Sequence, residues 1–224
     1  MKRMILGVTV LGFVAGCAGP RMVAPADVSK GSQVLEATDR SAASGALVDE
    51  SFKLGGFDVD DVDRDWNSSS GFGVAGYSKK TTTAGYTYTL KGKGQTWKGM
   101  CAARGGKQGV SLMGGSEASW GKTSITCECK NADATATVEL QDSANGELTS
   151  GDAKYKVSAV DETDKSNLTG SPAGFRYDSD EGSIGAVEIL RPGRVWLNER
   201  LPEAERPPVA CLSAGLMLYM PPKD

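Results

Sequence analysis

Histidine is absent from this chain of 224 residues. Its absence excludes catalysis by Ser-His-Asp or Cys-His groups, histidine-based zinc sites and histidine pH switches. An excess of basic residues is also lacking, because 25 lysines and arginines stand against 28 aspartates and glutamates, for a formal net charge of −3. The chain therefore lacks the basic footprint of a nucleic-acid-binding protein, and we expect no nucleic-acid partner.

Long apolar runs are missing too. The two longest apolar runs have about a dozen residues each, whereas a membrane-spanning helix needs roughly 20. The first run, residues 4–14, follows two basic residues and precedes Ala15, Gly16 and Cys17. A basic start, a short apolar stretch and small residues before a cleavage site are typical of a secretory signal peptide. An ordinary signal peptide with a chance cysteine is one reading of this segment.

The sequence Val14-Ala15-Gly16-Cys17 resembles the lipobox of bacterial lipoproteins. The resemblance implies that residues 1–16 are removed and that Cys17 carries a diacylglyceryl group on its sulfur and an acyl chain, such as palmitate, on its amine. Three acyl chains bind a membrane firmly, because each buried CH₂ contributes about 0.8 kcal/mol. In that family an aspartate after the cysteine commonly marks inner-membrane retention. Ala18 therefore implies the outer membrane of a bacterial cell envelope, facing the periplasm or the cell surface.

Residues 17–52 are poor in aromatics and rich in Ala, Ser, Gly and Asp. This composition predicts a flexible tether behind the lipidated cysteine. Val34 and Leu35 are too isolated to form a core face, and a short helix over 41–50 is the alternative to a tether there. We expect the folded domain to span residues 53–224.

From residue 53 onward, β-branched and aromatic residues alternate with polar ones, which predicts strands. After a short alternating stretch at 57–60, the predicted strands are 84–91, 95–104, 122–130, 134–141, 153–160, 173–177, 183–190 and 193–197. The turn-forming residues 178–182 predict a hairpin. Short strands at this spacing predict a mainly β domain, either an antiparallel barrel or a curled sandwich.

Residues 209–220 form the second apolar run, bounded by Pro207-Pro208 and Pro221-Pro222. Proline suits the first turn of a helix and also follows helix ends. A helix that is hydrophobic all round is buried in a protein or a membrane. About 12 residues rise only ~18 Å, less than the ~30 Å hydrocarbon layer. We therefore expect a helix buried at the centre of the β structure, with a last core strand as the alternative.

Four C-terminal segments carry a second resemblance: Gly174-Phe175-Arg176-Tyr177, residues 185–190, Gly193-Arg194-Val195-Trp196 and residues 209–219. They resemble the tubby and phospholipid-scramblase-like domains. The resemblance implies a barrel wrapped around the final helix, and several members of that family bind lipids or lipid headgroups. The basic phosphoinositide pocket of tubby proteins has no residue-by-residue counterpart in this chain.

Four cysteines follow Cys17: Cys101, Cys127, Cys129 and Cys211. An even count in an oxidising envelope predicts up to two disulfides. Cys127 and Cys129 lie on one face of a predicted strand, where a bond between them would be strained. We expect Cys101 to pair with Cys127 or Cys129. Cys211 is then either a buried free thiol, which we favour, or the partner of the remaining cysteine. A zinc site is the competitor, but Cys-Glu-Cys is not the usual zinc knuckle.

Asp61, Asp63 and Asp65 lie in a predicted acidic turn and are candidate Ca²⁺ ligands, because Ca²⁺ takes six to eight oxygens. Aligned with an EF-hand loop, however, they leave Trp66 at the position of the required glycine and Phe72 at that of the bidentate glutamate. A solvated acidic turn is the alternative, and we expect neither a metal nor another cofactor.

Four aromatic residues, Tyr86, Tyr88, Trp97 and Trp120, either line a groove for a sugar or a lipid or form the core of a small β domain. Core packing is the more ordinary role for such residues.

Catalytic motifs are weak. A nucleophile at Ser116 or Ser119 would lack a histidine base, which leaves only a Ser-Lys pair with Lys122. We therefore expect a non-enzymatic binding or structural module whose ligand is a lipid, a glycan or an envelope protein. The alternative is an envelope hydrolase that uses acidic residues or the Ser-Lys pair, and a carboxylate pair in a deep cleft would favour it.

Overall fold

The computed structural model describes residues 19–40, 50–74, 77–111, 117–142, 144–166 and 172–219. The description of residues 65–74, 77–82, 107–111 and 117–122 covers backbone only. The candidate lipidation site Cys17 and almost all of the helix considered over 41–50 lie outside the described residues.

The described residues form twelve strands, two α-helices and one turn of 3₁₀-helix. In chain order they are α1 (Ala26–Ser29), β1 (Ser32–Thr38), β2 (Phe52–Leu54), β3 (Phe57–Val74), β4 (Tyr77–Gly92), β5 (Gln95–Ser111), β6 (Glu117–Lys130), β7 (Thr135–Gln141), β8 (Asn145–Ser150), β9 (Ala153–Val160), β10 (Gly174–Ser179), β11 (Gly182–Glu188), β12 (Arg194–Asn198), the 3₁₀ turn Glu203–Glu205 and α2 (Arg206–Leu218).

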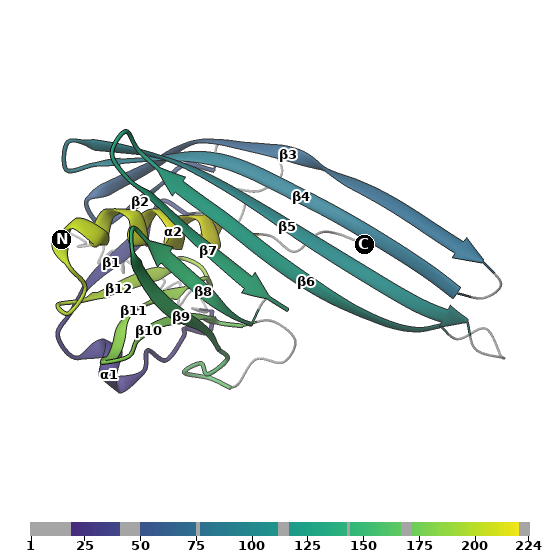
Figure 1. Ribbon diagram of the computed structural model, residues 1–224. Coiled ribbons are helices and arrows are strands. Elements are labelled where there is room, and N and C mark those ends of the chain that lie inside the picture. The colour runs from purple at the N-terminus through teal and green to yellow at the C-terminus, as the bar shows by residue number, and fades with distance from the viewer. Residues whose placement is uncertain are drawn as a thin grey trace, which may run out of the picture.

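The strands join into a closed antiparallel barrel (Figure 1). From β2 to β12 each strand pairs with its neighbour in sequence, and β1 closes the ring by pairing with both β12 and β2. Hairpin connections explain this order, because antiparallel neighbours need only short turns. The predicted fold class, a mainly β antiparallel barrel around a C-terminal helix, is confirmed.

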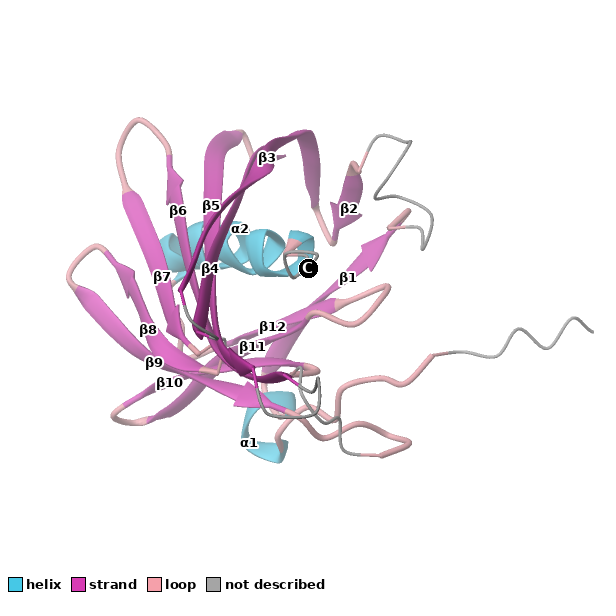
Figure 2. Ribbon diagram, turned by 90° about the vertical axis from the view of Figure 1, so that its right-hand side faces the viewer, coloured by secondary structure: helices cyan, strands magenta, loops and turns pink. Residues whose placement is uncertain are grey.

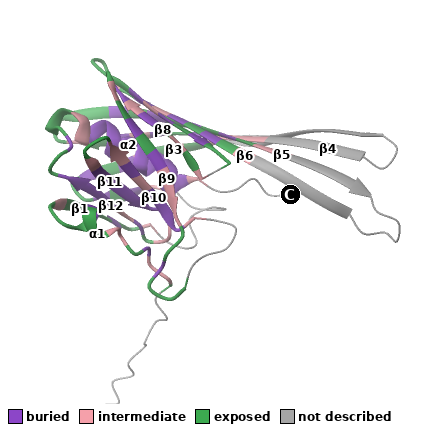
Figure 3. Cartoon of the chain, turned by 60° about the horizontal axis from the view of Figure 1, so that its bottom comes forward, coloured by how far each residue is buried: buried purple, intermediate pink, exposed green. Residues whose placement is uncertain are grey.

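The helix α2 lies inside the ring of strands (Figure 2), and every residue from Pro207 to Leu218 is buried (Figure 3). This is why its sequence is apolar on all faces, since the barrel wall surrounds it. The predicted central helix is confirmed, and the alternative of a last core strand is wrong. Among the described helices, none is long and apolar enough to cross a membrane.

The alternating strands place their apolar residues on the helix. In β4, Tyr86, Tyr88 and Leu90 are buried, whereas Thr87 between them is exposed. The eight strands predicted from residue 84 onward correspond to β4, β5, β6, β7, β9, β10, β11 and β12. β4, β5 and β6 are longer than predicted, and β8 was not predicted.

The predicted tether over 17–52 is wrong where it includes β1. Ser32–Thr38 forms a barrel strand, and Leu35 and Ala37 are buried against the core. Two inward-facing apolar residues are enough to attach this strand to the core, because its other face is exposed to solvent. The barrel therefore begins before the expected boundary at residue 53.

An N-terminal strap, which we define as residues 19–30, crosses the outside of β10, β11 and β12. It buries a second apolar cluster on that outer face, made of Met22, Val28, Ala173, Ala186 and Trp196. β11 is consequently buried on both faces, from Ser183 to Glu188. A strand covered on both sides reads as a continuous apolar run rather than as an alternating one.

The predicted acidic turn at 61–65 is also wrong, because these residues continue β3. The extra residues are absorbed as irregularities in the register with β4, between Asp60 and Asp63 and between Asp65 and Ser68. A bulge accommodates an extra residue without ending a strand.

β3 to β6 continue well beyond the barrel as a four-strand extension (Figure 1). β2 pairs with β3 only at residues 57–59, and β7 pairs with β6 only at residues 125–130. We define the extension as residues 68–74, 77–83, 104–111 and 117–124, which pair only with one another.

Candidate functional site

The barrel lumen is occupied by α2, which three wall tyrosines hold by hydrogen bonds. Tyr86 Oη donates to the carbonyl oxygen of Gly215 at 2.7 Å, and Tyr88 Oη donates to that of Cys211 at 2.8 Å. Tyr177 Oη lies 2.9 Å from Ser213 Oγ. Burial raises the pKa of all three phenols, so they stay neutral donors.

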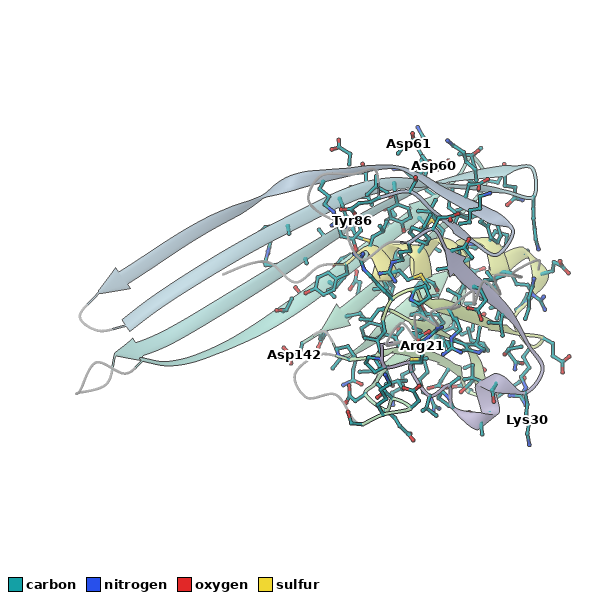
Figure 4. All side chains as sticks on the ribbon, turned by 180° about the vertical axis from the view of Figure 1, so that it is seen from behind. Arg21, Lys30, Asp60, Asp61, Tyr86 and Asp142 are labelled. Carbon is teal, nitrogen blue, oxygen red and sulfur yellow. A yellow bond between two sulfur atoms is a disulfide. The ribbon has the colours of Figure 1, made fainter. Side chains whose placement is uncertain are left out.

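The side chains of these tyrosines are therefore packed in the core. Tyr86, labelled in Figure 4, and Tyr88 and Trp97 are all at most 4 % exposed. The side chain of Trp120, the fourth aromatic candidate, lies outside the described part of the chain.

Two disulfides secure the wall and the helix, Cys101–Cys127 between β5 and β6 and Cys129–Cys211 between β6 and α2. The predicted pairing of Cys101 with Cys127 or Cys129 is confirmed. The favoured free thiol at Cys211 is wrong, because the central helix brings this residue against β6. The competing zinc site is wrong as well, since both disulfides consume its thiolates.

Two arginines cap the C-terminal end of α2, where the last carbonyl groups lack helical partners. Arg40 donates to the carbonyl oxygens of Met217 and, at 3.0 Å, Pro192. Arg64 donates to the carbonyl oxygen of Leu218 at 2.9 Å and to the carboxylate of Glu50 at 2.9 Å. Cations are favourable at this negative end of the helix dipole.

A cavity of about 180 Å³ lies beside this cap and is lined by Arg40, Glu50, Arg64, Ile189, Arg191, Met217, Leu218 and Tyr219. Burial, and then the neighbouring Arg191, lower the pKa of Arg40 to about 10. Arg40 and Arg64 are already engaged with carbonyl oxygens and with Glu50. The cavity is therefore part of the helix cap, and its arginines are not available as an open anion site.

A buried carboxylate fixes the N-terminal strap to the outer wall. Glu188 is fully buried and accepts hydrogen bonds from Arg21 at 2.8 Å, from Arg194 at 2.8 Å and from the backbone N–H of Met22 at 2.7 Å. Figure 4 labels Arg21 at this position. The Arg194 guanidinium also lies 4.8 Å from the centre of the Trp196 ring. Two cations and a backbone donor compensate the desolvation of one carboxylate.

A second polar cluster fixes α1 to the same wall. Ser183 Oγ lies 2.7 Å from the carboxylate of Asp27 and 2.6 Å from that of Asp178. The hydrogen bond from Ser183 is the main reason why the pKa of Asp27 is lowered. Arg176 donates two hydrogen bonds of 2.8 Å to Asp178. Ser183 is fully buried beneath the strap and is inaccessible to a substrate, and its hydrogen bonds to Asp27 and Asp178 attach α1 to the wall.

The outer wall carries a groove of about 310 Å³ across β4, β5 and β6, with mainly apolar atoms on its surface. It is lined by Asp61, Thr87, Tyr88, Thr89, Lys98, Gly99, Met100, Glu128 and Lys130. Met100 is 54 % exposed, the highest fraction among the large exposed hydrophobic residues of the described chain. Charges of both signs surround it, which gives the groove an apolar centre and a polar rim.

Three of the rim charges, Asp61, Glu128 and Lys130, are paired. Asp61 accepts a hydrogen bond from Thr89 Oγ1 at 2.9 Å and lies 3.3 Å from Lys91 Nζ. The Thr89 hydrogen bond and the Lys91 charge lower the pKa of Asp61. Glu128 lies 3.3 Å from Lys130 Nζ. Figure 4 shows Asp60 and Asp61 on the outer side of the wall.

The structure does not bring the calcium candidates into a site. Asp61 faces Thr89 and Lys91, Asp63 is in register with Thr87, and the side chain of Asp65 lies outside the described part. Among the described residues, no group of three or more acidic or cysteine side chains could hold a metal ion. Ser116 and the side chains of Ser119 and Lys122 also lie outside the described part, so the Ser-Lys hypothesis is untested.

Neither Glu188 nor the outer groove was predicted from the sequence. One signal pointed to Glu188, a single charge within the otherwise apolar run 184–190, because a charge in such a run needs a partner. The groove had no local signal, since its residues come from three strands that meet only in the fold.

The described tyrosines, cysteines and cap arginines are all engaged in holding the barrel and its helix together. The tyrosines are neutral and buried, Arg40 and Arg64 are engaged, and the cysteines are paired. Comparison of the chain with family models, with curated proteins and with solved structures found no match.

Proposed function

We propose that this chain is a lipid-anchored protein of the bacterial cell envelope and that its barrel is a non-enzymatic binding module. The observation that carries the proposal is the filled lumen. α2 occupies the space where a barrel of this kind would hold a small ligand, and two disulfides and three tyrosines lock the wall around it. Ligand binding is therefore assigned to the outer wall.

The position of the strap supports the anchor. Arg21, fixed to Glu188 on the wall, comes only four residues after Cys17. Four residues span at most about 14 Å. Acyl chains on Cys17 would hold the barrel close to the membrane surface rather than at the end of a long tether. The two disulfides agree with an oxidising compartment such as the bacterial periplasm or the cell surface.

The groove around Met100 is the proposed ligand site. Methionine adapts to varied partners and is common at the centre of protein interfaces, where a polar rim surrounds an apolar centre. A glycan would instead favour an exposed aromatic platform, but Tyr86, Tyr88 and Trp97 are buried. We therefore favour an envelope protein as ligand. A lipid is the second ligand class, because the tubby-like resemblance implies it.

Palmitate labelling tests the anchor. The Cys17→Ser variant should take up no label and should appear in the soluble fraction or as the unprocessed precursor. The wild-type chain should be labelled and should sediment with outer membranes. Equal labelling of the two proteins contradicts the lipid anchor.

Site-specific photocrosslinking in intact cells tests the groove. A photoreactive residue at Met100 should give one defined adduct. The same residue at Val34, which is 42 % exposed on β1 away from the groove, is the matched control and should give none. Adducts of equal yield at both positions, or no adduct at Met100, contradict the assignment of the ligand site. No observation within the described ranges favours the hydrolase alternative.

A further inference from the structure

The four-strand extension has two chemically different faces. Cross-strand pairs place residues in rows, and successive rows alternate between the two faces of a sheet. Exposed Ala102, Arg104 and Ser124 define the outer face where the extension leaves the barrel. From these residues toward the far end of the extension, every second row of the register lies on the outer face. The rows that alternate with them lie on the opposite face.

On the outer face, the two rows nearest the far end are rich in apolar and aromatic residues. The far row contains Val74, Tyr77, Val110 and Ala118, and the next row on that face contains Phe72, Lys79, Gln108 and Trp120. The two rows that alternate with them, on the side toward the barrel, belong to the opposite face. They contain only Gly71, Gly73, Ser78, Lys80, Lys107, Gly109, Ser119 and Gly121. The far end of the extension is therefore amphipathic across its thickness.

The extension is also basic, although the chain as a whole is acidic. Its basic residues are Lys79, Lys80, Arg104, Lys107 and Lys122, and its one acidic residue is Glu117. An apolar face flanked by lysines matches a bilayer surface that carries anionic headgroups. Each lysine near such a surface improves binding by about fivefold.

We propose that the far end of the extension docks on an anionic lipid bilayer and inserts its outer face into the interfacial region. This membrane contact is separate from the Cys17 anchor and from the groove at Met100. It gives the chain a second attachment that depends on lipid charge.

The small size of the apolar patch favours shallow insertion. Residues two apart on a strand are separated by about 7 Å, so the two apolar rows extend only about 7 Å along the outer face, which suits an interfacial element that penetrates 5–10 Å. A spanning β structure has an outward apolar band of about 25 Å. The second row already contains Lys79 and Gln108, and the next outer row contains Lys122. Shallow insertion keeps these residues at the headgroups.

The strand edges also favour shallow insertion. In the described part of the chain, β3 beyond residue 59 and β6 before residue 125 each pair on one side only. Unpaired backbone groups are not tolerated in hydrocarbon, and a spanning sheet must close into a barrel. At the headgroup level, water satisfies those groups.

Quenching of tryptophan fluorescence by brominated lipids tests the proposal on the full chain. Vesicles of brominated phosphatidylcholine, with or without one part in three of phosphatidylglycerol, are added to wild-type protein, Trp120→Phe and Trp196→Phe. We expect quenching in the anionic vesicles only. It should be lost in Trp120→Phe and kept in Trp196→Phe, because Trp196 is buried under the strap. If the protein sediments with the vesicles but its tryptophan fluorescence is not quenched, the Cys17 anchor is retained and the docking proposal is overturned.

A charge variant provides the second readout. Lys79→Gln combined with Lys122→Gln, the two lysines in the outer-face rows, should raise the anionic lipid concentration for half-maximal quenching by about 25-fold, fivefold for each lysine. The melting temperature of the barrel, which these residues lie outside, should not change. Equal quenching in neutral vesicles overturns the proposal. If the protein forms detergent-resistant oligomers and releases a dye entrapped in the vesicles, the proposal is also overturned. That result would indicate a ring of copies that spans the bilayer.

Discussion

At the scale of single residues, Gly215 lies where α2 packs tightly against the wall. A Cβ atom at this position would lie 2.5 Å from Tyr88 Oη and 2.7 Å from Cys101 Sγ. Both neighbours are fixed, Tyr88 by its hydrogen bond to the helix and Cys101 by a disulfide. We expect Gly215→Ala to destabilise the protein by about 1–3 kcal/mol through overpacking, even though alanine has the higher helix propensity. Denaturant unfolding measures the effect.

Gly106→Ala is the control for this prediction. No atom lies within 4 Å of a Cβ added at Gly106, so the free energy of unfolding should not change. An equal loss of stability in the two variants would contradict the tight contact at Gly215.

Residue roles could be predicted from the sequence only where the signal is local. The apolar run at 209–220 with its flanking prolines indicated a buried helix, and the spacing of Cys127 and Cys129 argued against a bond between them. The pair of Arg21 and Glu188 is separated by 167 positions, so no local pattern connects the two. Arg21 could be understood only after β11 and the strap had been placed side by side.

At the scale of elements, the three tyrosines that bind α2 make the helix sensitive to alkaline pH. Their pKa values are raised in the folded protein by burial, whereas unfolded tyrosine ionises near pH 10. The folded state therefore binds more protons than the unfolded state above pH 10. Their stabilising effect is complete below pH 10 and is lost as the pH rises toward their folded pKa values.

We therefore expect the free energy of unfolding to fall above pH 10 by about 1.4 kcal/mol per pH unit for each tyrosine. Denaturant unfolding between pH 9 and 11 measures this slope. The ultraviolet absorbance of tyrosinate should rise from these groups only as the protein unfolds. Tyr177→Phe should reduce the slope, and a stability independent of pH over this range would contradict the buried hydrogen bonds.

The disulfide between α2 and β6 should contribute more than the one between adjacent strands. Cys129–Cys211 closes a loop of 82 residues and Cys101–Cys127 one of 26. In the chain-entropy model these loops correspond to about 4.5 and 3.5 kcal/mol. The double variant Cys129→Ala, Cys211→Ala should therefore melt below Cys101→Ala, Cys127→Ala. The opposite order would show that the helix is held mainly by packing.

Elements with one polar and one apolar face were predicted well, because period-two alternation is a direct signal of a half-buried strand. β4 and β9 are examples. β1 was missed because only Leu35 and Ala37 face the core among polar neighbours. The outer halves of β3, β5 and β6 were missed because glycine and serine are frequent in them, and these residues ordinarily indicate turns.

At the scale of the whole molecule, both ends of the described chain complete the barrel. The C-terminal helix fills the lumen, and the N-terminal strap covers the outer face of β10 to β12 before β1 closes the ring. The consecutive strands β2 to β12 alone would form an open sheet, because β1 is the strand that pairs with both β2 and β12. Closure thus depends on contacts between the first and last thirds of the chain, which a sequence pattern cannot reveal.

The buried ion pair of Glu188 is where this closure can be tested. Glu188→Gln keeps the volume of the side chain but removes the charge that compensates Arg21 and Arg194. Breaking a buried ion pair costs about 3 kcal/mol or more, which corresponds to a fall in melting temperature of roughly 6–12 °C. The strap should also detach more often, so limited proteolysis should cleave within residues 19–30 faster than in the wild-type protein. Glu147→Gln, which disrupts an exposed pair with Lys154, is the control and should change neither quantity. If Glu188→Gln melts lower but the strap is cleaved at the wild-type rate, Glu188 stabilises the wall without holding the strap, and the short link between Cys17 and the barrel is no longer supported.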